Sequence, residues 1–573
     1  MLTSDQNSRT DQYFILTAFI LAVLLRFFQL GVRPLSDAEA RLALQAWDIA
    51  RGGHPVLDAH PGYILLTAIN FFLFGSGNFL ARFWPALAGA SLVFLPVAFS
   101  KQLGRMGTIL LAFALAVDPG LIAISRIADD RMMALGFLAL FFSFLHIRSY
   151  KLAGVMAGVA LLSGPSIWLG LLGILITLGL IKISNKNWSF KELGISDYSA
   201  DSTNIMLYWG LGTFFILGTL LFVIPNGLSA WAGSLIQYFQ GFFLPVASLG
   251  WHPWITLLVY EALLLVLGII GLVVSFVRKD HSAIYLAILS FVILFLASID
   301  PSHQIGDLVW FILPFWVMAI IGLARILDGL YVFIRSSVQT WVVAVVSLIF
   351  LVFIELNLKA LPNVLGFNND LFQSRLLLII GALVLLVLVV LLASSVWDER
   401  IAQAGVLLGV GAALLLITIS AGIAGAGIKM EEYNETWSIS PQFTDADMLL
   451  ETIQNISQWQ VGQPEILTVT VSSDVDYPSL LWTLRNFQLQ KVSSIPKDTL
   501  PELIVHAQGD VLPNPDQYRE RAFEIGRYPV FSALGWDGWF RWSMTRSVPY
   551  NSDHLVLAVR TDILPVSIVG SGQ

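Results

Sequence analysis

Arg33-Pro-Leu-Ser-Asp-Ala-Glu-Ala-Arg41 begins a polar loop that lies between two apolar segments of this 573-residue chain. Only 12% of the residues in the chain are charged, so the composition of this loop is unusual. Up to His60 it contains four carboxylates, three arginines and two histidines: Asp37, Glu39, Asp48, Asp58, Arg33, Arg41, Arg51, His54 and His60. Binding and catalytic residues are often carried by loops that a rigid scaffold positions. We therefore expect this loop to carry the chemistry of the protein.

The remainder of the chain is strongly apolar. Hydrophobic residues make up 56% of it, and the charged fraction is about half that of an average soluble domain. Apolar runs of about 20 residues recur along the sequence, which predicts a polytopic α-helical membrane protein. The absence of cysteine excludes disulfides, thiolate metal sites and a cysteine nucleophile. The sequence contains no block of basic residues of the kind that would indicate a nucleic-acid partner.

The hydropathy pattern predicts about thirteen transmembrane helices. Tyr63–Phe74 is too short to span a bilayer, and we expect it to be a helix in the membrane interface. With a cytoplasmic N-terminus, most lysines and arginines fall on the cytoplasmic side, as the positive-inside rule requires. We therefore predict a multi-pass protein of the plasma (inner) membrane. The expected spans are 13–31, 82–100, 106–124, 132–147, 152–163, 165–183, 206–224, 254–277, 283–299, 308–327, 338–356, 373–395 and 403–427.

The interiors of these predicted spans are nearly free of charge. Arg26 lies about a turn from the outer end of its span and is expected to snorkel, while Glu261 and Glu355 are also near outer ends. Pumps and ion-coupled transporters usually carry ionisable residues in mid-span. The pattern argues against a transporter and places the reactive groups at the outer face.

The composition changes after residue 428, where polar residues and strand-like runs become common. We predict a transmembrane domain over 1–428 and an extracytoplasmic soluble α/β domain over 429–573. Strands are expected at Glu465–Val471, Leu503–His506 and His554–Val559, with a helix over Pro478–Phe487. A tryptophan-rich segment, 535–542, suits either a sugar-stacking surface or a seam against the membrane, and we favour the seam.

A second outer loop, Ser125-Arg-Ile-Ala-Asp-Asp-Arg131, is also rich in charge. Helix packing could bring it beside the first loop. A carboxylate there, from Asp37 or Glu39 or from Asp129 or Asp130, could act as general base towards a hydroxyl group. For Asp37 and Glu39 the structural alternative is helix capping, which is compatible with catalysis.

Arginines in the two loops break the positive-inside rule. Arginine binds phosphate well through its planar set of donors, so these side chains are candidates for gripping a phosphate and stabilising its charge. The alternative is local pairing with loop carboxylates or lipid headgroups. The candidates are Arg41, Arg82, Arg126 and Arg131.

Four motifs in this order resemble those of the GT-C membrane glycosyltransferases, in particular the protein O-mannosyltransferase and aminoarabinose transferase branch. Two departures from the family pattern matter. Asp37-Ala-Glu39 replaces an adjacent Asp-Glu pair, and the acids of the second loop are shifted by one or two positions. The motifs are Ser36-Asp-Ala-Glu-Ala40, His60-Pro-Gly-Tyr63, Phe74-Gly-Ser-Gly-Asn-Phe-Leu-Ala-Arg82 and Ser125-Arg-Ile-Ala128.

The resemblance implies an inverting glycosyltransferase that takes a sugar from a polyprenyl-phosphate donor. The acceptor would be a hydroxyl of a lipid, glycan or protein at the outer membrane face. Asp37, Glu39, Asp129 and Asp130 would be catalytic, and His60 would join the four arginines in binding substrate. For a cofactor the resemblance leaves two alternatives, none or a divalent metal bound by the acids. The alternative function is a degenerate lipid-binding or glycan-binding protein, or a scaffold subunit of a membrane complex.

Overall fold

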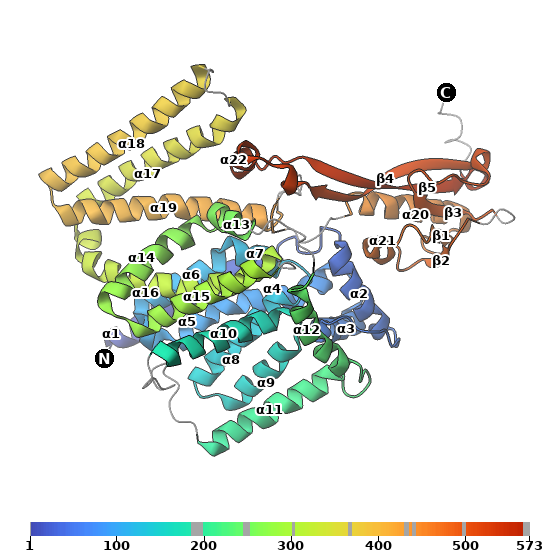
Figure 1. The fold of residues 1–573 in the computed structure, drawn as a ribbon, viewed down its shortest axis with the longest axis horizontal. Coiled ribbons are helices and arrows are strands. Elements are labelled where there is room, and N and C mark those ends of the chain that lie inside the picture. The colour runs from blue at the N-terminus through green and yellow to red at the C-terminus, as the bar shows by residue number, and fades with distance from the viewer. Residues whose placement is uncertain are drawn as a thin grey trace.

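The structure is a computed structural model that describes most of the chain. It is predominantly helical, with a single described sheet near the C-terminus (Figure 1). The described residues are 2–184, 199–244, 252–300, 304–364, 370–428, 435–437, 443–495 and 500–564.

Helices α1 to α19 precede the sheet and form the helical bundle. Their bounds are α1 (Leu2–Phe27), α2 (Asp37–Ala50), α3 (Pro61–Phe74), α4 (Asn78–Ser91), α5 (Leu95–Ala98), α6 (Ser100–Val117), α7 (Pro119–Ser125), α8 (Arg131–His146), α9 (Tyr150–Leu162), α10 (Ser166–Ser184), α11 (Ala200–Gly218), α12 (Gly227–Gly241), α13 (His252–Tyr260), α14 (Ala262–Arg278), α15 (His281–Ile299), α16 (Val309–Ser336), α17 (Val338–Ala360), α18 (Asp370–Val396) and α19 (Glu399–Gly425).

The membrane character of the bundle is confirmed. Among the described residues, 8 helices are long and apolar enough to cross a bilayer, or up to 10 if each bent pair is one span. The bent pairs are α6 with α7, at 51°, and α13 with α14, at 93°. Each of the thirteen predicted segments overlaps a helix, but thirteen crossings stay a prediction. The segment expected in the interface is helix α3, which begins at Pro61, where a missing N–H costs no hydrogen bond.

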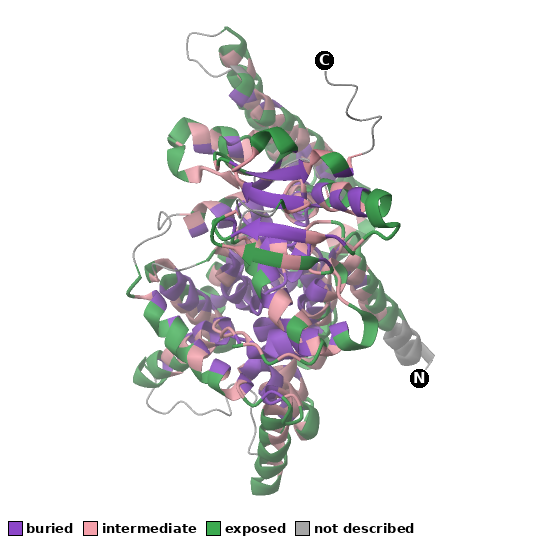
Figure 2. Ribbon diagram, turned by 90° about the vertical axis from the view of Figure 1, so that its right-hand side faces the viewer, coloured by how far each residue is buried: buried purple, intermediate pink, exposed green. Residues whose placement is uncertain are grey.

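The C-terminal region folds around a five-stranded sheet of order β2-β1-β3-β5-β4. The three predicted strands correspond to β1 (Thr468–Ser472), β3 (Leu503–Ala507) and β5 (Tyr550–Arg560). The first two are parallel, whereas β5 is antiparallel to both of its neighbours. Figure 2 shows the buried strands in the middle of this sheet. The remaining elements are β2 (Gln488–Val492), β4 (Tyr518–Pro529), α20 (Ala446–Val461), α21 (Pro478–Thr483) and α22 (Trp536–Thr545).

The sheet region rests on the first loop and its neighbours (Figure 1). The backbone N–H of Ser479, in α21, donates to Oδ1 of Asp37, in α2, over 2.9 Å. The indole of Trp482 donates to Oδ1 of Asn78 over 2.8 Å and stacks on Phe71, with ring centroids 5.7 Å apart. These contacts join segments more than 400 residues apart and fix the first loop from the side of the sheet.

The tryptophan-rich segment forms helix α22, whose inward side packs against the helical bundle, whereas a seam against the membrane stays a prediction. Trp539 and Trp542 are buried, and Phe531 stacks on Trp539 with centroids 5.5 Å apart. Trp542 contacts Tyr260 of α13, which ties the sheet region to the bundle. Trp536, at the start of the same helix, is 83% exposed.

A buried polar cluster lies at the two bends, which corrects the expectation of charge-free span interiors. Arg26 does not snorkel; it is fully buried and donates to the carbonyls of Leu115 and Ala116 and to Ser125 Oγ. Asp118 caps α7 by accepting from the N–H of Leu121 and also accepts from the Trp316 indole. Glu261 accepts from the N–H of Gly120.

These three ionisable groups hold the short helix α7 from three sides. Arg26 comes from α1, Asp118 from the bend before α7, and Glu261 from the bend between α13 and α14. Helix α7 ends at Ser125, directly before the second charged loop. The cluster therefore fixes the base of that loop.

Candidate active site

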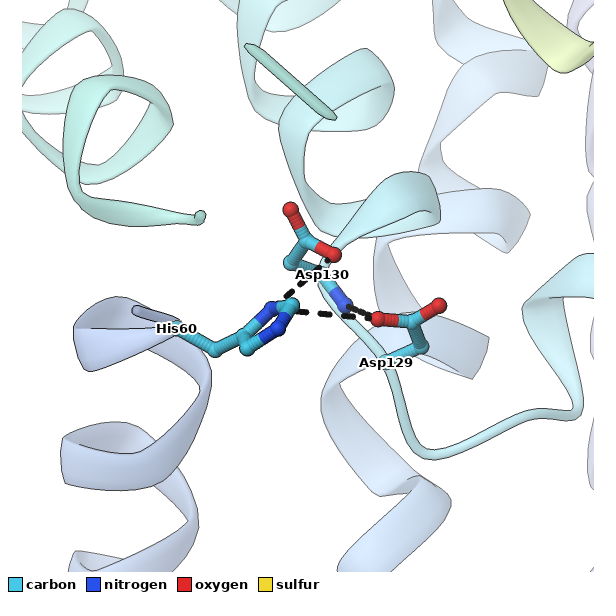
Figure 3. Close-up of side chains that lie close together, drawn as sticks. All are labelled: His60, Asp129 and Asp130. Atoms are coloured by element: carbon cyan, nitrogen blue, oxygen red, sulfur yellow. Dashed lines mark hydrogen bonds and ion pairs between the residues drawn. The ribbon is translucent and has the colours of Figure 1, made fainter. Parts of the chain in front are cut away.

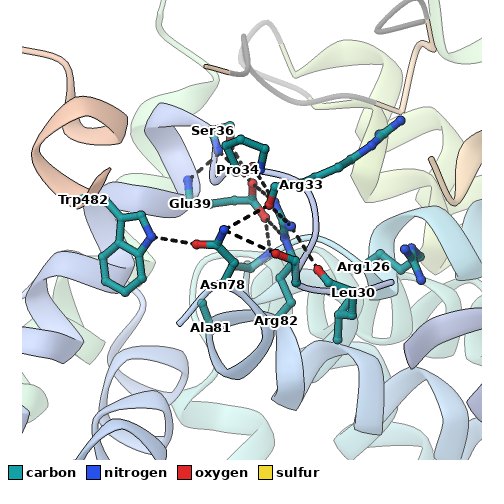
Figure 4. Close-up of polar contacts among 12 residues, drawn as sticks. Leu30, Arg33, Pro34, Ser36, Glu39, Asn78, Ala81, Arg82, Arg126 and Trp482 are labelled. Carbon is teal, nitrogen blue, oxygen red and sulfur yellow. Dashed lines mark hydrogen bonds and ion pairs between the residues drawn. The ribbon is translucent and has the colours of Figure 1, made fainter. Parts of the chain in front are cut away.

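The first-loop carboxylate Glu39 lies inside a saturated polar network (Figure 4). Ser36 and Glu39 form a capping box at the start of α2. The Arg82 guanidinium donates to both carboxylate oxygens of Glu39, at 2.8 and 2.9 Å. The backbone N–H of Ala128 donates to Glu39 over 2.8 Å, so the two charged loops are in contact.

The charge on Glu39 is stabilised in this network. Burial alone would raise its pKa, but the Arg82 charge and the hydrogen bonds from Arg82, Ala128 and Ser36 lower the pKa below its ordinary value. Glu39 is therefore an anion with its hydrogen-bonding capacity occupied. A group in this state is a poor proton acceptor.

Two of the predicted phosphate-binding arginines are directed at backbone carbonyls. Besides Glu39, Arg82 donates to the carbonyls of Leu30, Arg33 and Pro34. Arg126 satisfies the C-terminal end of α1, where helix carbonyls lack intrahelical donors. Its acceptors are the carbonyls of Leu25, Arg26, Phe28 and Gln29.

The remaining first-loop candidates lie on helix α2. Asp37 is partly buried, and its Oδ1 accepts the bond from Ser479 in the sheet region. Arg41 follows one turn later and is exposed. Asp37 and Glu39 lie on the same helix turn but have different partners: Asp37 contacts the sheet region, whereas Glu39 pairs with Arg82.

The second group of candidates comes together where α3 begins and the second loop ends (Figure 3). His60 Nδ1 lies 3.2 Å from Oδ1 of Asp130 and 3.9 Å from Oδ1 of Asp129. Nδ1 is buried and makes no well-aligned hydrogen bond. His60, Asp129 and Asp130, predicted from separate motifs, thus form one cluster.

Burial dominates the protonation of this cluster. It raises the pKa of Asp130 from its ordinary value of 3.8 to about 7, with the nearby Asp307 charge acting in the same direction. Burial, followed by the Arg131 charge, lowers the pKa of His60 to about 4. At neutral pH His60 is therefore uncharged, and Asp130 exchanges readily between its acid and carboxylate forms.

Asp130 is positioned by the turn between α9 and α10. Its Oδ2 accepts from the N–H of Ser166 over 3.0 Å. Gly164, in the same turn, has φ +154°, and a Cβ there would collide with the Asp130 carboxylate. A glycine is needed for this close approach.

Arg131 connects the cluster to a further segment that sequence reasoning missed. Its guanidinium pairs with Asp129 and, over 3.1 Å, with Oδ1 of Asp307; it also donates to Gln304 over 2.5 Å. Asp307 lies in the 3-10 helix Ile305–Leu308 between α15 and α16. One sequence signal could have predicted this contact. The outer loop 300–307 contains two aspartates but no lysine or arginine, so its charge is opposite to that of the arginines in the other two loops.

The cluster has the donor set of a metal site. One ligand atom from each of His60, Asp129 and Asp130 lies within 4.8 Å of the other two. The orphaned Nδ1 of His60 supports the fit, and a mixed nitrogen and oxygen set suits a divalent transition metal. Arg131 competes with a cation for Asp129.

No family model and no curated protein matches the sequence. The fold is similar to the crystal structure of ArnT from Cupriavidus metallidurans bound to undecaprenyl phosphate, at 16% identity and a TM-score of 0.53. That match covers 96% of this chain and 99% of ArnT. The apo state of the same ArnT matches at 15% identity and a TM-score of 0.51, over 97% and 99% of the two chains.

This chain has the GT-C fold. The apo oligosaccharyltransferase from Archaeoglobus fulgidus also matches, at 13% identity and a TM-score of 0.46, over 84% of this chain and 64% of that one. Within the GT-C fold of this protein, the two charged loops meet at the end of the bundle that carries the sheet region. The chemistry of the site rests on the residues described above.

Proposed function

We propose that this protein is a glycosyltransferase that moves a sugar from a polyprenyl-phosphate donor to a hydroxyl acceptor on a lipid, glycan or protein, with inversion at the sugar. The observation that carries the proposal is the cluster of His60, Asp129, Asp130 and Arg131 at the junction of the two loops. An acid, an uncharged imidazole and a guanidinium in one place are the groups that hydroxyl activation and phosphate departure require.

Asp130 is the proposed proton acceptor. A carboxyl group with a pKa of about 7 is available as a base at neutral pH and holds a proton more firmly than an ordinary aspartate. His60, whose Nδ1 lies 3.2 Å from Oδ1 of Asp130, is uncharged at neutral pH and positions that carboxylate. This assignment favours Asp130 over the first-loop acids Asp37 and Glu39.

Arg131 and Arg41 are the proposed partners of the phosphate. The carboxylates of Asp129 and Asp307 outnumber Arg131, so the cluster alone would repel an anionic headgroup. A divalent metal held by His60, Asp129 and Asp130 would supply the positive charge that a departing phosphate needs. A carboxylate bound to that metal would not serve as the base, so the metal site and the Asp130 base are alternative uses of the cluster. Arg41 is exposed on α2 and can reach towards solvent and lipid.

Glu39, Arg82 and Arg126 are proposed to position the loops, in place of the catalytic and phosphate-binding roles expected from the sequence. Their polar atoms are directed at each other and at carbonyls that end or precede helices. They act on the reaction through the geometry of the second loop.

The domain division and the sidedness complete the proposal. Residues 1–428 would form the transmembrane enzyme, and 429–573 a soluble domain on the same side as the site. The bond between Ser479 and Asp37 supports this, because it links the two parts next to the loops. With the N-terminus in the cytoplasm, this side is extracytoplasmic.

Membranes containing the full chain, incubated with radiolabelled polyprenyl-phosphate sugars, test the activity. We expect label to move to an acceptor, and Asp130→Asn to reduce the rate by about 10²–10⁴-fold. Asp398→Asn, a cap of α19 distant from the loops, is the matched control and should transfer sugar normally. Full transfer by Asp130→Asn would refute the proposed base.

A second candidate function is a lipid or glycan carrier that lacks turnover. It is favoured by the saturation of Glu39 and by the use of Asp37 as an anchor for the sheet region. This candidate predicts that purified protein binds the labelled donor but transfers nothing. Binding without transfer, across several donor sugars, would select it.

A further inference from the structure

A groove lies between α14 and α15 on the outside of the bundle. It has a volume of ≈ 370 Å³, and Phe276, Phe291 and Phe295 expose 46–63% of their surface beside it. Both helices pack mainly on α16 and much less on one another. The lining is wholly apolar: Leu272, Phe276, Ile284, Ala287, Ile288, Phe291, Val292 and Phe295.

The turn that closes one end of this groove is basic. Arg278 ends α14, and Lys279 follows in a left-handed conformation with φ 54°. Both side chains are exposed, and each lies within one turn of the groove residue Phe276. The turn therefore places cations at the end of an apolar groove.

Arg325 of α16 adds a third cation beside the turn. It pairs with Asp280, and its Nη1 is buried without a hydrogen-bond partner among the described residues. Because Asp280 directly follows Lys279 in the chain, its pair with Arg325 brings the three cations to the same turn. The three cations outnumber the carboxylates of Asp280 and Asp328.

This turn lies at the end of the bundle opposite the candidate active site. Helix α14 starts at the buried Glu261 bend, and α15 leads back to the segment that holds Asp307. The groove therefore belongs to the other leaflet from the one that the two charged loops face. Its occupant is a component of that leaflet and not the sugar donor.

We propose that the groove binds an acyl chain of an anionic phospholipid, whose phosphate headgroup is held by Arg278, Lys279 and Arg325. Basic residues between transmembrane helices at the cytoplasmic side are suited to anionic headgroups. A zwitterionic lipid fills the same groove, but its headgroup carries its own cation and gains less from this turn. Charge complementarity thus separates the proposed ligand from ordinary annular lipid.

Native mass spectrometry of the full chain tests the proposal, with dioleoyl phosphatidylglycerol or dioleoyl phosphatidylcholine added to the micelles at equal mole fraction. We expect selective retention of phosphatidylglycerol. The double variant Arg278→Gln, Lys279→Gln should lower that retention by roughly tenfold and leave phosphatidylcholine unchanged. The matched control is Lys151→Gln, Lys182→Gln, which removes two exposed lysines from the same end of the bundle.

A groove variant keeps the test independent of the charge variant. Ile288→Trp fills the partly exposed middle of the groove and should reduce phosphatidylglycerol retention while leaving the basic turn intact. Equal retention of the two lipids by the unmodified protein would overturn the proposal. So would phosphatidylglycerol retention that is the same in the control, charge and groove variants.

Discussion

Glu39 and Asp130 are buried carboxyl groups in adjoining loops, and they meet opposite environments. Glu39 is 3% exposed and accepts bonds from Arg82, Ala128 and Ser36. Asp130 is 1% exposed and has an uncharged histidine on one oxygen and a backbone N–H on the other. Burial is the same in the two cases, but the compensation for it differs.

The difference shows how burial alone fails to identify a reactive carboxylate. A buried carboxylate paired with arginine stays ionised and holds the structure together, whereas one without a full charge partner has a raised pKa and exchanges protons near neutrality. In the function that we propose, the first-loop acid belongs to the scaffold and the second-loop acid is the reacting group.

The largest expected effect comes from breaking the Glu39 pair. Arg82→Ala leaves the buried Glu39 carboxylate without its charge partner and removes one donor from three backbone carbonyls, so we expect a loss of about 3–5 kcal/mol in the free energy of unfolding. Thermal unfolding of the purified protein in detergent measures it. Arg41→Ala, on an exposed side chain, should change stability by no more than about 0.5 kcal/mol. Equal stability of the two variants would show that the pair between Glu39 and Arg82 does not stabilise the fold.

The second prediction concerns a cation at the Asp130 cluster. We expect the protein to bind Mn²⁺ and expect His60→Gln to weaken that binding by at least about 10–100-fold, because the imidazole nitrogen is replaced by an amide. Titration calorimetry of the full chain measures the affinity. His54→Gln, in the same loop but outside the cluster, is the matched control. An unchanged Mn²⁺ affinity in His60→Gln would show that the cluster is not a metal site.

The third prediction follows from the raised pKa of Asp130. If its carboxylate is the working form, transfer falls by about tenfold per unit as pH drops below about 7. The folded-state pKa lies above the unfolded value, so the stabilising contribution of Asp130 is complete below about pH 4 and is lost as pH rises through 7. Activity should therefore rise and the stability contribution of Asp130 should fall as pH increases from about 4 to about 7, and both should level off above that.

Asp130→Asn provides the check on this linkage. An amide does not titrate here, so the variant should lose that part of the pH dependence of unfolding, as followed by thermal melts across the range. A variant that keeps the wild-type pH profile would assign the titration to another group.

The smallest effect is expected where the sheet region docks. The Arg485 guanidinium lies 4.0 Å from the Trp482 ring centroid and donates to Ser76 Oγ. Arg485→Gln should weaken docking by about 1 kcal/mol and increase proteolysis between the bundle and the sheet without lowering the stability of the bundle. The control variant Arg519→Gln, on the exposed part of β4, should be cleaved by the protease at the same rate as the wild type.

Much of the fold could be predicted because apolar length and alternation are local signals. Every predicted span overlaps a helix, and the central strands β1 and β3 were visible as apolar runs. The edge strands β2 and β4 were missed because polar and charged residues interrupt their apolar patterns, as is common in edge strands. Asp118 was missed and Glu261 was underrated because Trp316 and Gly120, their respective partners, come from distant parts of the chain.

That the charged residues of the two loops lie close together could be predicted from the sequence, but how they pair could not. The sequence placed His60, Asp129, Asp130 and Arg131 in two charged loops, and the structure brings these four together. The sequence could not show that Arg82 would pair with Glu39 or that Arg126 would donate to the carbonyls at the end of α1. Several acceptors lie near each arginine, and no local sequence pattern indicates which of them it binds. Asp307 joined only through tertiary contact.

The bond between Asp37 and Ser479 has a consequence for how the protein is made. The two residues are separated by 442 positions, so the first loop is synthesised and inserted long before its partner exists. During that interval the charged first loop lacks the surface that later fixes it. A chain whose synthesis stops before the sheet region would have an inserted bundle with an unsupported first loop. That loop is a feature by which membrane quality control would distinguish the incomplete chain from the complete one.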